Sequence, residues 1–512
     1  MINNSFFAPK DFLDINQNFW TKIPDYNTSF LIDLTVVDHE YLNVHLITMR
    51  ALVDILKAKP VALVFSSNEL GIISLAKSYG INDFVYVDDF EISFLSKLGL
   101  SVRAVLFWLF ARTKNKLLNI KYKGDIVGHF VYDTFLASTG LGTIKWWDIR
   151  FAKYLRFGLI LYKKFQKVFS QRKYILFLGS EQIYVGSGIS SLVALKHGIK
   201  ILYRKHGPNR VSYKKYSNIA DLDLFPTHPD QDDFKNMLKG DTTIALQWMN
   251  SYITNLFGGV VSNYDWNAKN AYSNAQKLNE GEYQIFFDKK YKYHVFIFSH
   301  VFVDAVHGYR EGLFPDYETW LRETLKIASK RKDVMWIIKP HPSDNSYKTK
   351  SSSVTVYKDF AHFDNIKLFP PSTLTSNLVD NIDAVLTMRG TVVGEYSCIG
   401  VPVFTAGRSP FDEGGFCITP KNIGEYRDLL LHTKFERLSD EIVKRAKIYM
   451  YVYHNYGRIS MPLFNDLESV QSSTPSREEI YNHLLFKMKK MDVKNVLDKD
   501  YKEYIFNKLN KV

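Results

Sequence analysis

Two short segments in the last third of the chain combine residue types that suit phosphate binding. In WIIKPHPSDN (residues 336–345), Lys339 and His341 follow an apolar strand, and a proline on either side of His341 stiffens the turn. A cation and an imidazole held in this way suit a diphosphate or a nucleoside monophosphate leaving group. Taken alone, the segment fits equally well a strand end with a solvated lysine and a hydrogen-bonded histidine.

The second segment is TMRGTVVGEYSCIGVPVFTAG (residues 387–407), in which a helix is predicted to begin directly after Arg389, Gly390 and Thr391. Gly390 would let the backbone approach a ligand closely, and Thr391 is predicted to cap the helix. The free N–H groups of such a helix start suit a phosphate. Glu395, one turn later, is a candidate ligand for ribose hydroxyls, although a lone glutamate in a helix is most often only solvated.

Candidate catalytic residues lie in the loop SHVFVDAVHG (residues 299–308), where His300, Asp304 and His307 are predicted to project into a cleft. Asp304 could act as the base on an acceptor hydroxyl, or as a nucleophile if anomeric configuration is retained. Two rivals stand in the first half, Glu181 in LGSEQIYVGSG and His206 in RKHGPNR. An Asp304 that only orients its loop is an equally good interpretation.

We expect neither a metal ion nor a tightly bound cofactor, so that a nucleotide sugar would enter as a substrate. The Asp-x-Asp triplets at 221–223 and 230–233 are common by chance, and Cys398 and Cys417 lack metal-ligand spacing. No P-loop sequence occurs, which argues against an NTPase. With only two cysteines, a disulfide framework is excluded and a reducing compartment fits best.

The elements that must position these residues follow an α/β pattern. The 512 residues are too many for one ordinary core, and strands alternate with helices from about residue 24 and again from about residue 293. We therefore predict a GT-B-like α/β fold in which two Rossmann-type domains face a central cleft. The predicted bounds are 1–280 for an acceptor domain with a basic helical insertion at about 101–173, 281–440 for a donor domain, 441–470 for a helix crossing back, and 471–512 for a linker and basic helical tail.

The net charge of +13 favours anionic partners. Residues 151–173 hold seven lysines and arginines and no acid, and residues 101–116 share this character. Six apolar residues of the first segment fall near one helical face: Phe151, Leu155, Leu159, Tyr162, Phe165 and Phe169. This pattern is typical of a helix on an anionic membrane surface, although a core-facing helix with a basic rim is the somewhat better interpretation.

Neither a signal peptide nor an uninterrupted apolar run of about 18 to 20 residues is apparent in the sequence. We therefore expect a cytoplasmic protein, with peripheral contact at the inner face of the membrane as an open alternative.

The two segments together resemble a known family. The Lys-x-His-Pro strand end and the Gly-Thr-x-x-x-Glu helix, closed by Gly-x-Pro-Val, look like the bacterial capsule and surface-polysaccharide glycosyltransferases, including the β-Kdo transferases. The resemblance covers about residues 294–420 and includes HVFVDAVHG and LFPDYETWLRETL within 300–325. It implies a GT-B fold working without a catalytic metal.

The resemblance also implies residue roles. Lys339, His341 and the turn from Arg389 through Gly390 to Thr391 would bind the donor phosphate, and Glu395 would hold the ribose. The Kdo enzymes imply a CMP-activated ulosonic acid as donor. Asp412 stands where several members have tyrosine, which leaves the sugar open.

The leading hypothesis is therefore a glycosyltransferase that moves Kdo or another ulosonic acid from a CMP donor to a growing capsule, O-antigen or lipopolysaccharide glycan. Its acceptor would be a glycan or a lipid-linked glycan. Alternatives on the same fold are a transferase for UDP- or GDP-sugars, a polyol-phosphate polymerase and a nucleotide-sugar epimerase. A nucleic-acid-binding protein has only the net charge in its favour, so we expect no nucleic-acid partner.

Overall fold

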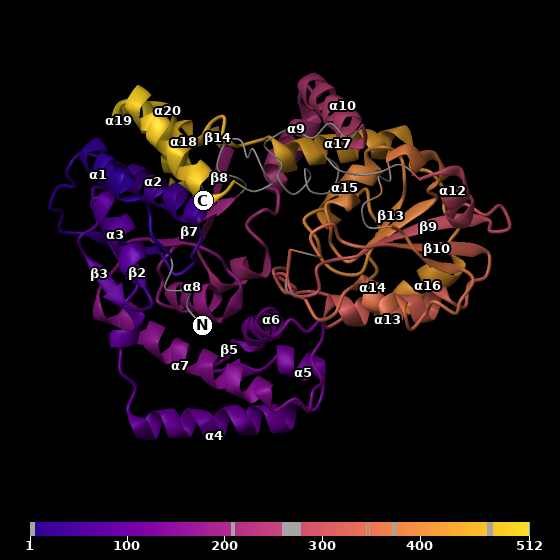
Figure 1. Cartoon of the computed structure of the whole chain (residues 1–512), viewed down its shortest axis with the longest axis horizontal. Coiled ribbons are helices and arrows are strands. Elements are labelled where there is room, and N and C mark those ends of the chain that lie inside the picture. The colour runs from indigo at the N-terminus through magenta and orange to yellow at the C-terminus, as the bar shows by residue number, and fades with distance from the viewer. Residues whose placement is uncertain are drawn as a thin grey trace.

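The computed structural model describes residues 6–205, 210–258, 278–344, 346–347, 349–370, 373, 376–467 and 475–510. The chain is an α/β protein in two halves, each built on its own sheet with helices around it (Figure 1). The predicted α/β class and GT-B-like two-sheet layout are confirmed by these sheets.

The sheet of the N-terminal half has seven strands in the order β14-β8-β7-β6-β1-β2-β3. The pairs among β6, β7 and β1 to β3 are parallel, whereas β8 and β14 join one edge antiparallel. Its strands are β1 (Ser29–Asp33), β2 (Lys59–Val64), β3 (Phe84–Tyr86), β6 (Phe177–Gly179), β7 (Ile201–Lys205), β8 (Arg210–Tyr216) and β14 (Ile459–Ser460). β1 is buried along its whole length, as expected for a strand covered on both faces.

The sheet of the C-terminal half has five parallel strands in the order β11-β10-β9-β12-β13. Its strands are β9 (Tyr293–Phe298), β10 (Val334–Lys339), β11 (Ile366–Leu368), β12 (Ala384–Thr387) and β13 (Val403–Thr405). Because all five are parallel, the loops that follow them meet at one edge of the sheet.

The helices of the N-terminal half are α1 (Lys10–Phe19), α2 (His39–Leu56), α3 (Leu70–Ser78), α4 (Phe94–Ala111), α5 (Lys114–Leu118), α6 (Gly128–Thr139), α7 (Arg150–Gln171) and α8 (Ile189–Lys196). A hairpin of β4 (Lys121–Tyr122) and β5 (Asp125–Ile126) lies between α5 and α6. The later helices are α9 (Gln231–Lys239), α10 (Thr243–Phe257), α12 (Glu280–Phe286), α13 (Tyr317–Ala328), α14 (Ser353–Tyr357), α15 (Val392–Ser397), α16 (Ile423–His432), α17 (Asp440–His454), α18 (Arg477–Lys490), α19 (Val493–Val496) and α20 (Lys499–Asn510).

The division between the halves differs from the predicted bounds. Helices α9 and α10 precede residue 280 but pack on α17 in the C-terminal half, where the rings of Phe234 and Tyr449 lie 4.8 Å apart. α17 itself stays on that half, and the chain returns only at β14, which pairs with β8. The polar, helical sequence pattern before residue 280 did not indicate which half these helices would cover.

The C-terminal helices are part of the N-terminal core rather than a tail. α18 and α20 pack on α2, and Tyr481 and Tyr501 are almost fully buried there. The hydroxyl of Tyr213 on β8 lies 2.7 Å from that of Tyr501 and 2.6 Å from that of Thr48. The first residues of the predicted linker and tail (471–512), residues 471–474, lie outside the described residues.

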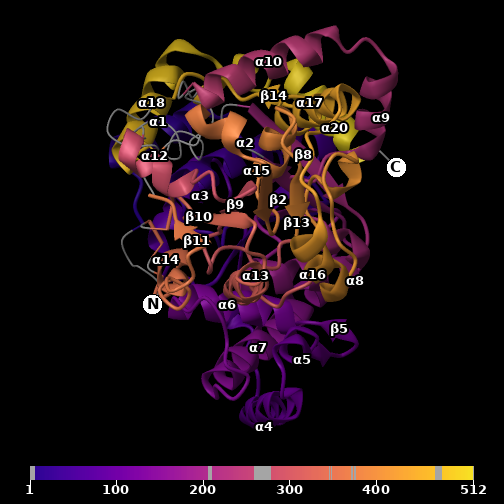
Figure 2. The same ribbon diagram turned by 90° about the vertical axis from the view of Figure 1, so that its right-hand side faces the viewer.

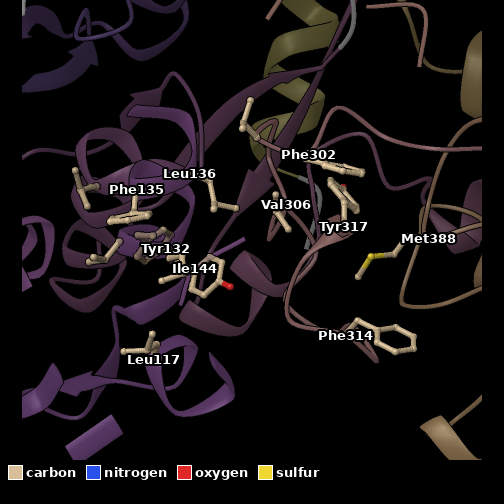
Figure 3. Close-up of a cluster of buried hydrophobic side chains, with 14 of the residues drawn as sticks. Leu117, Tyr132, Phe135, Leu136, Ile144, Phe302, Val306, Phe314, Tyr317 and Met388 are labelled. Atoms are coloured by element: carbon tan, nitrogen blue, oxygen red, sulfur yellow. The ribbon is translucent and has the colours of Figure 1, made fainter. Parts of the chain in front are cut away.

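The two halves are joined by a mixed polar and apolar contact. On the polar side, the hydroxyl of Tyr132 on α6 donates to Oδ2 of Asp316 at 2.6 Å. Figure 3 shows Tyr132, Leu136 and Ile144 of the N-terminal half in the same buried cluster as Phe302 and Val306, which follow β9. The position of one half against the other is therefore held by directional bonds as well as by burial.

Helix α7 contains the predicted membrane-surface segment, and the structure assigns it to the core. All six apolar residues of its predicted face are buried: Phe151, Leu155, Leu159, Tyr162, Phe165 and Phe169. The core-facing interpretation is therefore correct for this segment, and the membrane interpretation is wrong. Among the described residues, α4 is the one helix long and apolar enough to cross a membrane by length and composition, which the search for uninterrupted apolar runs missed.

Candidate active site

The loops after β9, β12 and β10 bring His300, Arg389 and His341 together. Nε2 of His300 accepts the backbone N–H of Arg389 at 3.4 Å and lies 3.0 Å from Oγ1 of Thr387. The ring stacks on Tyr317 with 4.2 Å between centroids. Burial, with the nearby charges of His341 and Arg389, lowers the pKa of His300 well below its ordinary value. His300 is thus a neutral imidazole with its proton on Nδ1.

His341 is held in one tautomer. The backbone N–H of Ser343 donates to its Nδ1 at 3.1 Å, which leaves the ring proton on Nε2. Burial lowers the pKa of His341 to about 4. At neutral pH the residue therefore offers a phosphate a neutral N–H donor rather than an imidazolium charge.

Lys339, at the end of β10, is anchored to the loop after β11. Its Nζ donates to the carbonyls of Thr373 at 2.6 Å and Pro370 at 3.2 Å, and it lies 5.0 Å from the centroid of the Phe369 ring. Burial lowers the pKa of Lys339 to about 7. Because an opposite charge favours the ammonium form, an anion bound beside Lys339 would strengthen its positive charge.

Arg389 is placed differently from the prediction. Its side chain is only 9% exposed and lies under the loop after β9, where Nη1 donates to the carbonyl of Tyr309 at 2.8 Å. The guanidinium sits about equally far from the rings of Tyr309 and Tyr317, at 6.0 and 5.9 Å. Within the described part of the chain, no carboxylate forms an ion pair with it. The buried guanidinium of Arg389 adds positive charge at this edge of the sheet.

The turn after Arg389 fulfils only part of its predicted role. The predicted cap is wrong, because Thr391 has helical backbone angles and its side chain makes no capping hydrogen bond to α15. At Gly390, a Cβ would lie 3.3 Å from Oγ1 of Thr387 and 3.6 Å from Cε1 of His300, so this backbone does lie close to the histidine. Glu395 is 6% exposed, and its role as a ribose ligand stays a prediction.

Asp304 and Glu181 come together from opposite halves of the chain. Burial raises the pKa of Asp304, against a hydrogen bond from Tyr347 that lowers it. Burial, followed by the negative charges of Asp304 and Asp33, raises the pKa of Glu181 to about 7. The charge of Asp304 thus opposes the ionisation of Glu181, so Glu181 keeps its proton to a higher pH than an isolated glutamate does.

The backbone is strained on both sides of this carboxyl pair. Tyr184 has φ 60° and Ala305 has φ 43°, both in the left-handed region that residues other than glycine rarely adopt. The N–H of Ala305 donates to the Tyr184 hydroxyl at 3.4 Å, so the two strained residues contact each other across the halves. Tyr184 also begins a π-helical turn, Tyr184–Gly188. Such features concentrate at functional sites.

His307 serves the contact between the halves rather than the cleft. Its Nδ1 lies 2.5 Å from Oδ1 of Asp133 on α6, and its Nε2 lies 2.9 Å from the carbonyl of Pro315. With both ring nitrogens occupied, His307 is a structural residue. The rival His206 lies outside the described residues.

The strand ends of the N-terminal sheet contribute polar residues that the sequence analysis missed. Asp33 ends β1, and its Oδ2 accepts from the Ser180 hydroxyl at 2.5 Å. Arg204 on β7 lies 4.4 Å from the centroid of the Tyr41 ring and 3.8 Å from Oε1 of Glu40. The rule applied to Lys339, a polar residue at the carboxyl end of a parallel strand, would have found Asp33 and Arg204.

The Asp-x-Asp triplets have structural roles. Asp223 pairs with Arg310 at 2.9 Å, Asp221 closes a capping box with Asn218, and Asp230 caps α9. Across the residues that the structure describes, no group of three or more histidine, cysteine, aspartate or glutamate side chains is placed to hold a metal ion.

Comparison with known proteins finds similarity only at the level of solved structures. No protein-family model matches the chain, and no curated protein sequence matches it. One similar structure is Thermosulfurimonas dismutans KpsC, a β-Kdo 2,4 transferase, at 14% identity and TM-score 0.36 over 61% of this chain and 87% of that one.

Two further similar structures cover nearly the whole chain. The UDP-GlcNAc 2-epimerase from Neisseria meningitidis is 9% identical with TM-score 0.25, over 90% of this chain and 100% of that one. A glycosyltransferase from Rickettsia africae is 10% identical with TM-score 0.25, over 93% and 100%. At such identities and scores, the functional conclusion has to come from the site itself.

Proposed function

We propose that the protein is a glycosyltransferase that uses a nucleotide sugar, held by the C-terminal half, to glycosylate an acceptor held against the N-terminal half. The observation that carries this proposal is the pairing of two environments. Arg389, Lys339 and His341 give one sheet edge positive charge and an N–H donor, while Asp304 and Glu181 hold raised pKa values where the halves meet.

The first environment suits a departing phosphate. In glycosyl transfer, negative charge builds up on the phosphate as the bond to the sugar breaks, and pre-placed donors stabilise it. The Nε2–H of His341 and the ammonium of Lys339 would supply this stabilisation, with Arg389 adding positive potential from beneath. We propose that no further cofactor is required.

The second environment suits the acceptor. A carboxylate with a pKa near the working pH is an efficient base for a hydroxyl proton. Glu181, with its pKa raised to about 7, meets this condition, and Asp304 beside it is the alternative base. The strained Tyr184 and Ala305 hold the two carboxyl-bearing segments against each other.

The favoured donor is a CMP-activated ulosonic acid such as CMP-Kdo, and the favoured acceptor is a bacterial surface glycan assembled in the cytoplasm. Support for this choice comes from the motif resemblance of residues 294–420. A nucleotide-sugar epimerase is the second candidate, because two carboxyl groups with raised pKa values also suit proton removal from a sugar carbon.

The test is thermal unfolding of the wild type and of His341→Ala with CMP, UMP, UDP, GDP and their sugars. A ligand present at a hundred times its Kd stabilises the folded state by about 2.7 kcal/mol. The proposal expects stabilisation by CMP and CMP-Kdo that His341→Ala removes. The matched control is His362→Ala, an exposed histidine of the same half, which should respond as the wild type does.

Two other outcomes are informative. Stabilisation by UDP-sugars alone, with product formation from the free nucleotide sugar, would replace the transferase with the epimerase. No stabilisation by any nucleotide would refute the proposed donor site.

A further inference from the structure

Helix α4 exposes an apolar face along its whole length. Leu100, Ala104 and Ala111 are its buried residues, whereas eight large apolar side chains are exposed: Phe94, Leu95, Leu98, Val102, Val105, Leu106, Leu109 and Phe110. Phe94 is 78% and Phe110 71% exposed. At 3.6 residues per turn these eight positions share one side of the helix. Figures 1 and 2 show α4 at the outer edge of the molecule, beside α7 and away from both sheets.

The orientation of α4 is fixed by two serines, Ser96 and Ser101, which face α7. Nε of Arg156 on α7 donates to Oγ of Ser101 at 2.7 Å, and Nζ of Lys163 donates to Oγ of Ser96 at 2.5 Å. A helix on the surface of a water-soluble domain normally turns its apolar side to the core. Here hydrogen bonds hold the apolar side outward, so the exposed face is a built feature of the N-terminal half.

The surroundings of this face are strongly basic. Residues 94–124 contain seven lysines and arginines and no aspartate or glutamate. Lys97 and Arg103 are exposed on α4 itself, and Arg112 follows directly after its end. An apolar helix face bordered by positive charge is complementary to a lipid layer that has anionic headgroups outside and an apolar interior.

A second exposed apolar group lies at the start of α7. Trp146, Trp147 and Ile149 are 40%, 58% and 62% exposed. The hydrogen bonds of Ser96 and Ser101 to α7 show that α4 and α7 run antiparallel, so this group lies toward the C-terminal end of α4. Tryptophan is enriched at the boundary between lipid headgroups and acyl chains.

We propose that α4, together with Trp146, Trp147 and Ile149, docks the protein on an anionic lipid bilayer, with the helix lying in the plane of the interface. Eighteen residues at about 1.5 Å each give a length close to the thickness of the hydrocarbon core. Crossing the bilayer would nevertheless break the bonds from Arg156 and Lys163 and place Lys97 and Arg103 in hydrocarbon. Lying flat keeps these bonds and buries only the apolar face.

The docking surface lies one helix layer from the carboxyl pair. α7 separates α4 from the π-helical turn, and at Gly158 of α7 a Cβ would come within 3.4 Å of Cγ1 of Val185, the residue after Tyr184. A bilayer on α4 would therefore bring a lipid-linked acceptor near the proposed acceptor side. The docking itself does not depend on the proposed transferase activity and is tested without it.

The experiment is flotation of the full chain with vesicles of equal parts phosphatidylglycerol and phosphatidylcholine, and with vesicles of phosphatidylcholine alone. The proposal expects binding to the anionic vesicles that weakens at least about tenfold without phosphatidylglycerol or in about 0.5 M NaCl. In the double variant Leu98→Glu and Leu109→Glu, binding should also fall at least about tenfold. The matched control, Ile244→Glu and Ile285→Glu, changes similarly exposed residues on α10 and α12 and should bind as the wild type does.

Folding and oligomeric state are measured alongside. Both double variants should keep the wild-type circular dichroism spectrum, because all four positions are exposed; if the α4 variant does not, Phe110→Ser replaces it in the same assay. The proposal is overturned if the wild type does not float with the anionic vesicles, or if the α4 variant floats equally well. It is also overturned if sedimentation shows that the wild type is a dimer and the α4 variant is a monomer. The last result would assign the face to a second copy of the chain.

Discussion

Replacing Glu181 by glutamine should change how the stability of the protein depends on pH. The pKa of Glu181 is raised in the folded state from its ordinary value of 4.5 to about 7, first by burial and then by the negative charges of Asp304 and Asp33. A carboxyl group whose pKa is raised on folding binds its proton more tightly in the folded state. Its ionisation therefore destabilises the fold progressively between pH 4.5 and pH 7, and this cost stays constant above pH 7.

The size of the effect follows from the shift. A rise of the Glu181 pKa from 4.5 to about 7 corresponds to roughly 3 kcal/mol when fully developed. Between pH 5 and pH 8 this destabilisation grows by roughly 2 to 3 kcal/mol, because a small part of it is already present at pH 5. Glutamine cannot ionise, so Glu181→Gln should gain that amount in unfolding free energy, relative to the wild type, as the pH is raised over this interval.

The assay is urea unfolding of both proteins at pH 5, 6, 7 and 8, comparing unfolding free energies at an unchanged m-value. If Glu181 is also the catalytic base, wild-type kcat/KM should rise with pH through about 7, and Glu181→Gln should lose activity by about 100- to 10,000-fold. Asp304→Asn removes a neighbouring charge, so the midpoint of that rise should move to lower pH. A stability difference between Glu181→Gln and wild type that does not vary with pH would refute the raised pKa of Glu181.

Two further predictions concern the contact between the halves. His307→Ala should lower the unfolding free energy by about 3 to 5 kcal/mol in a denaturation series, because the buried Asp133 carboxylate loses its imidazole partner and keeps the backbone N–H of residue 307. A loss below about 1 kcal/mol would show that the His307–Asp133 pair does not hold the halves together. Gly142→Ala places a Cβ 2.7 Å from Cδ2 of Phe302, so it should lower the unfolding free energy by about 1 to 3 kcal/mol in calorimetry. The control is Gly99→Ala, whose Cβ meets nothing within 4 Å and which should be neutral or slightly stabilising. Equal effects of the two alanines would contradict the close approach of the halves.

The sequence predicted the C-terminal site better than the N-terminal one for a physical reason. A run such as DVMWIIKPHP marks both a buried strand and its end, so the edge position of Lys339 and His341 follows from the chain alone. The backbone of Arg389 likewise lies just past the end of a strand, as predicted, but its side chain turns beneath the loop after β9. That direction depends on Tyr309 and Tyr317, which no local pattern connects to Arg389.

The two basic helices show the limit of periodicity. Both α4 and α7 carry apolar residues at helical spacing with lysine and arginine around them. Periodicity identifies an apolar side but does not say whether protein or solvent faces it. The structure buries that side in α7 and exposes it in α4, which is why we propose a membrane contact for α4 and not for residues 151–173.

The sequence by itself determined the α/β class, the presence of two sheets and the strand ends at which polar residues gather, because these depend on local burial patterns and turn residues. The tertiary structure alone decided which helices cover which half, that Glu181 and Asp304 meet, and that His307 joins the halves through Asp133. These features depend on contacts between residues more than a hundred positions apart. Such contacts are selected by the packing of whole elements, and the raised pKa values exist only once that packing has removed water.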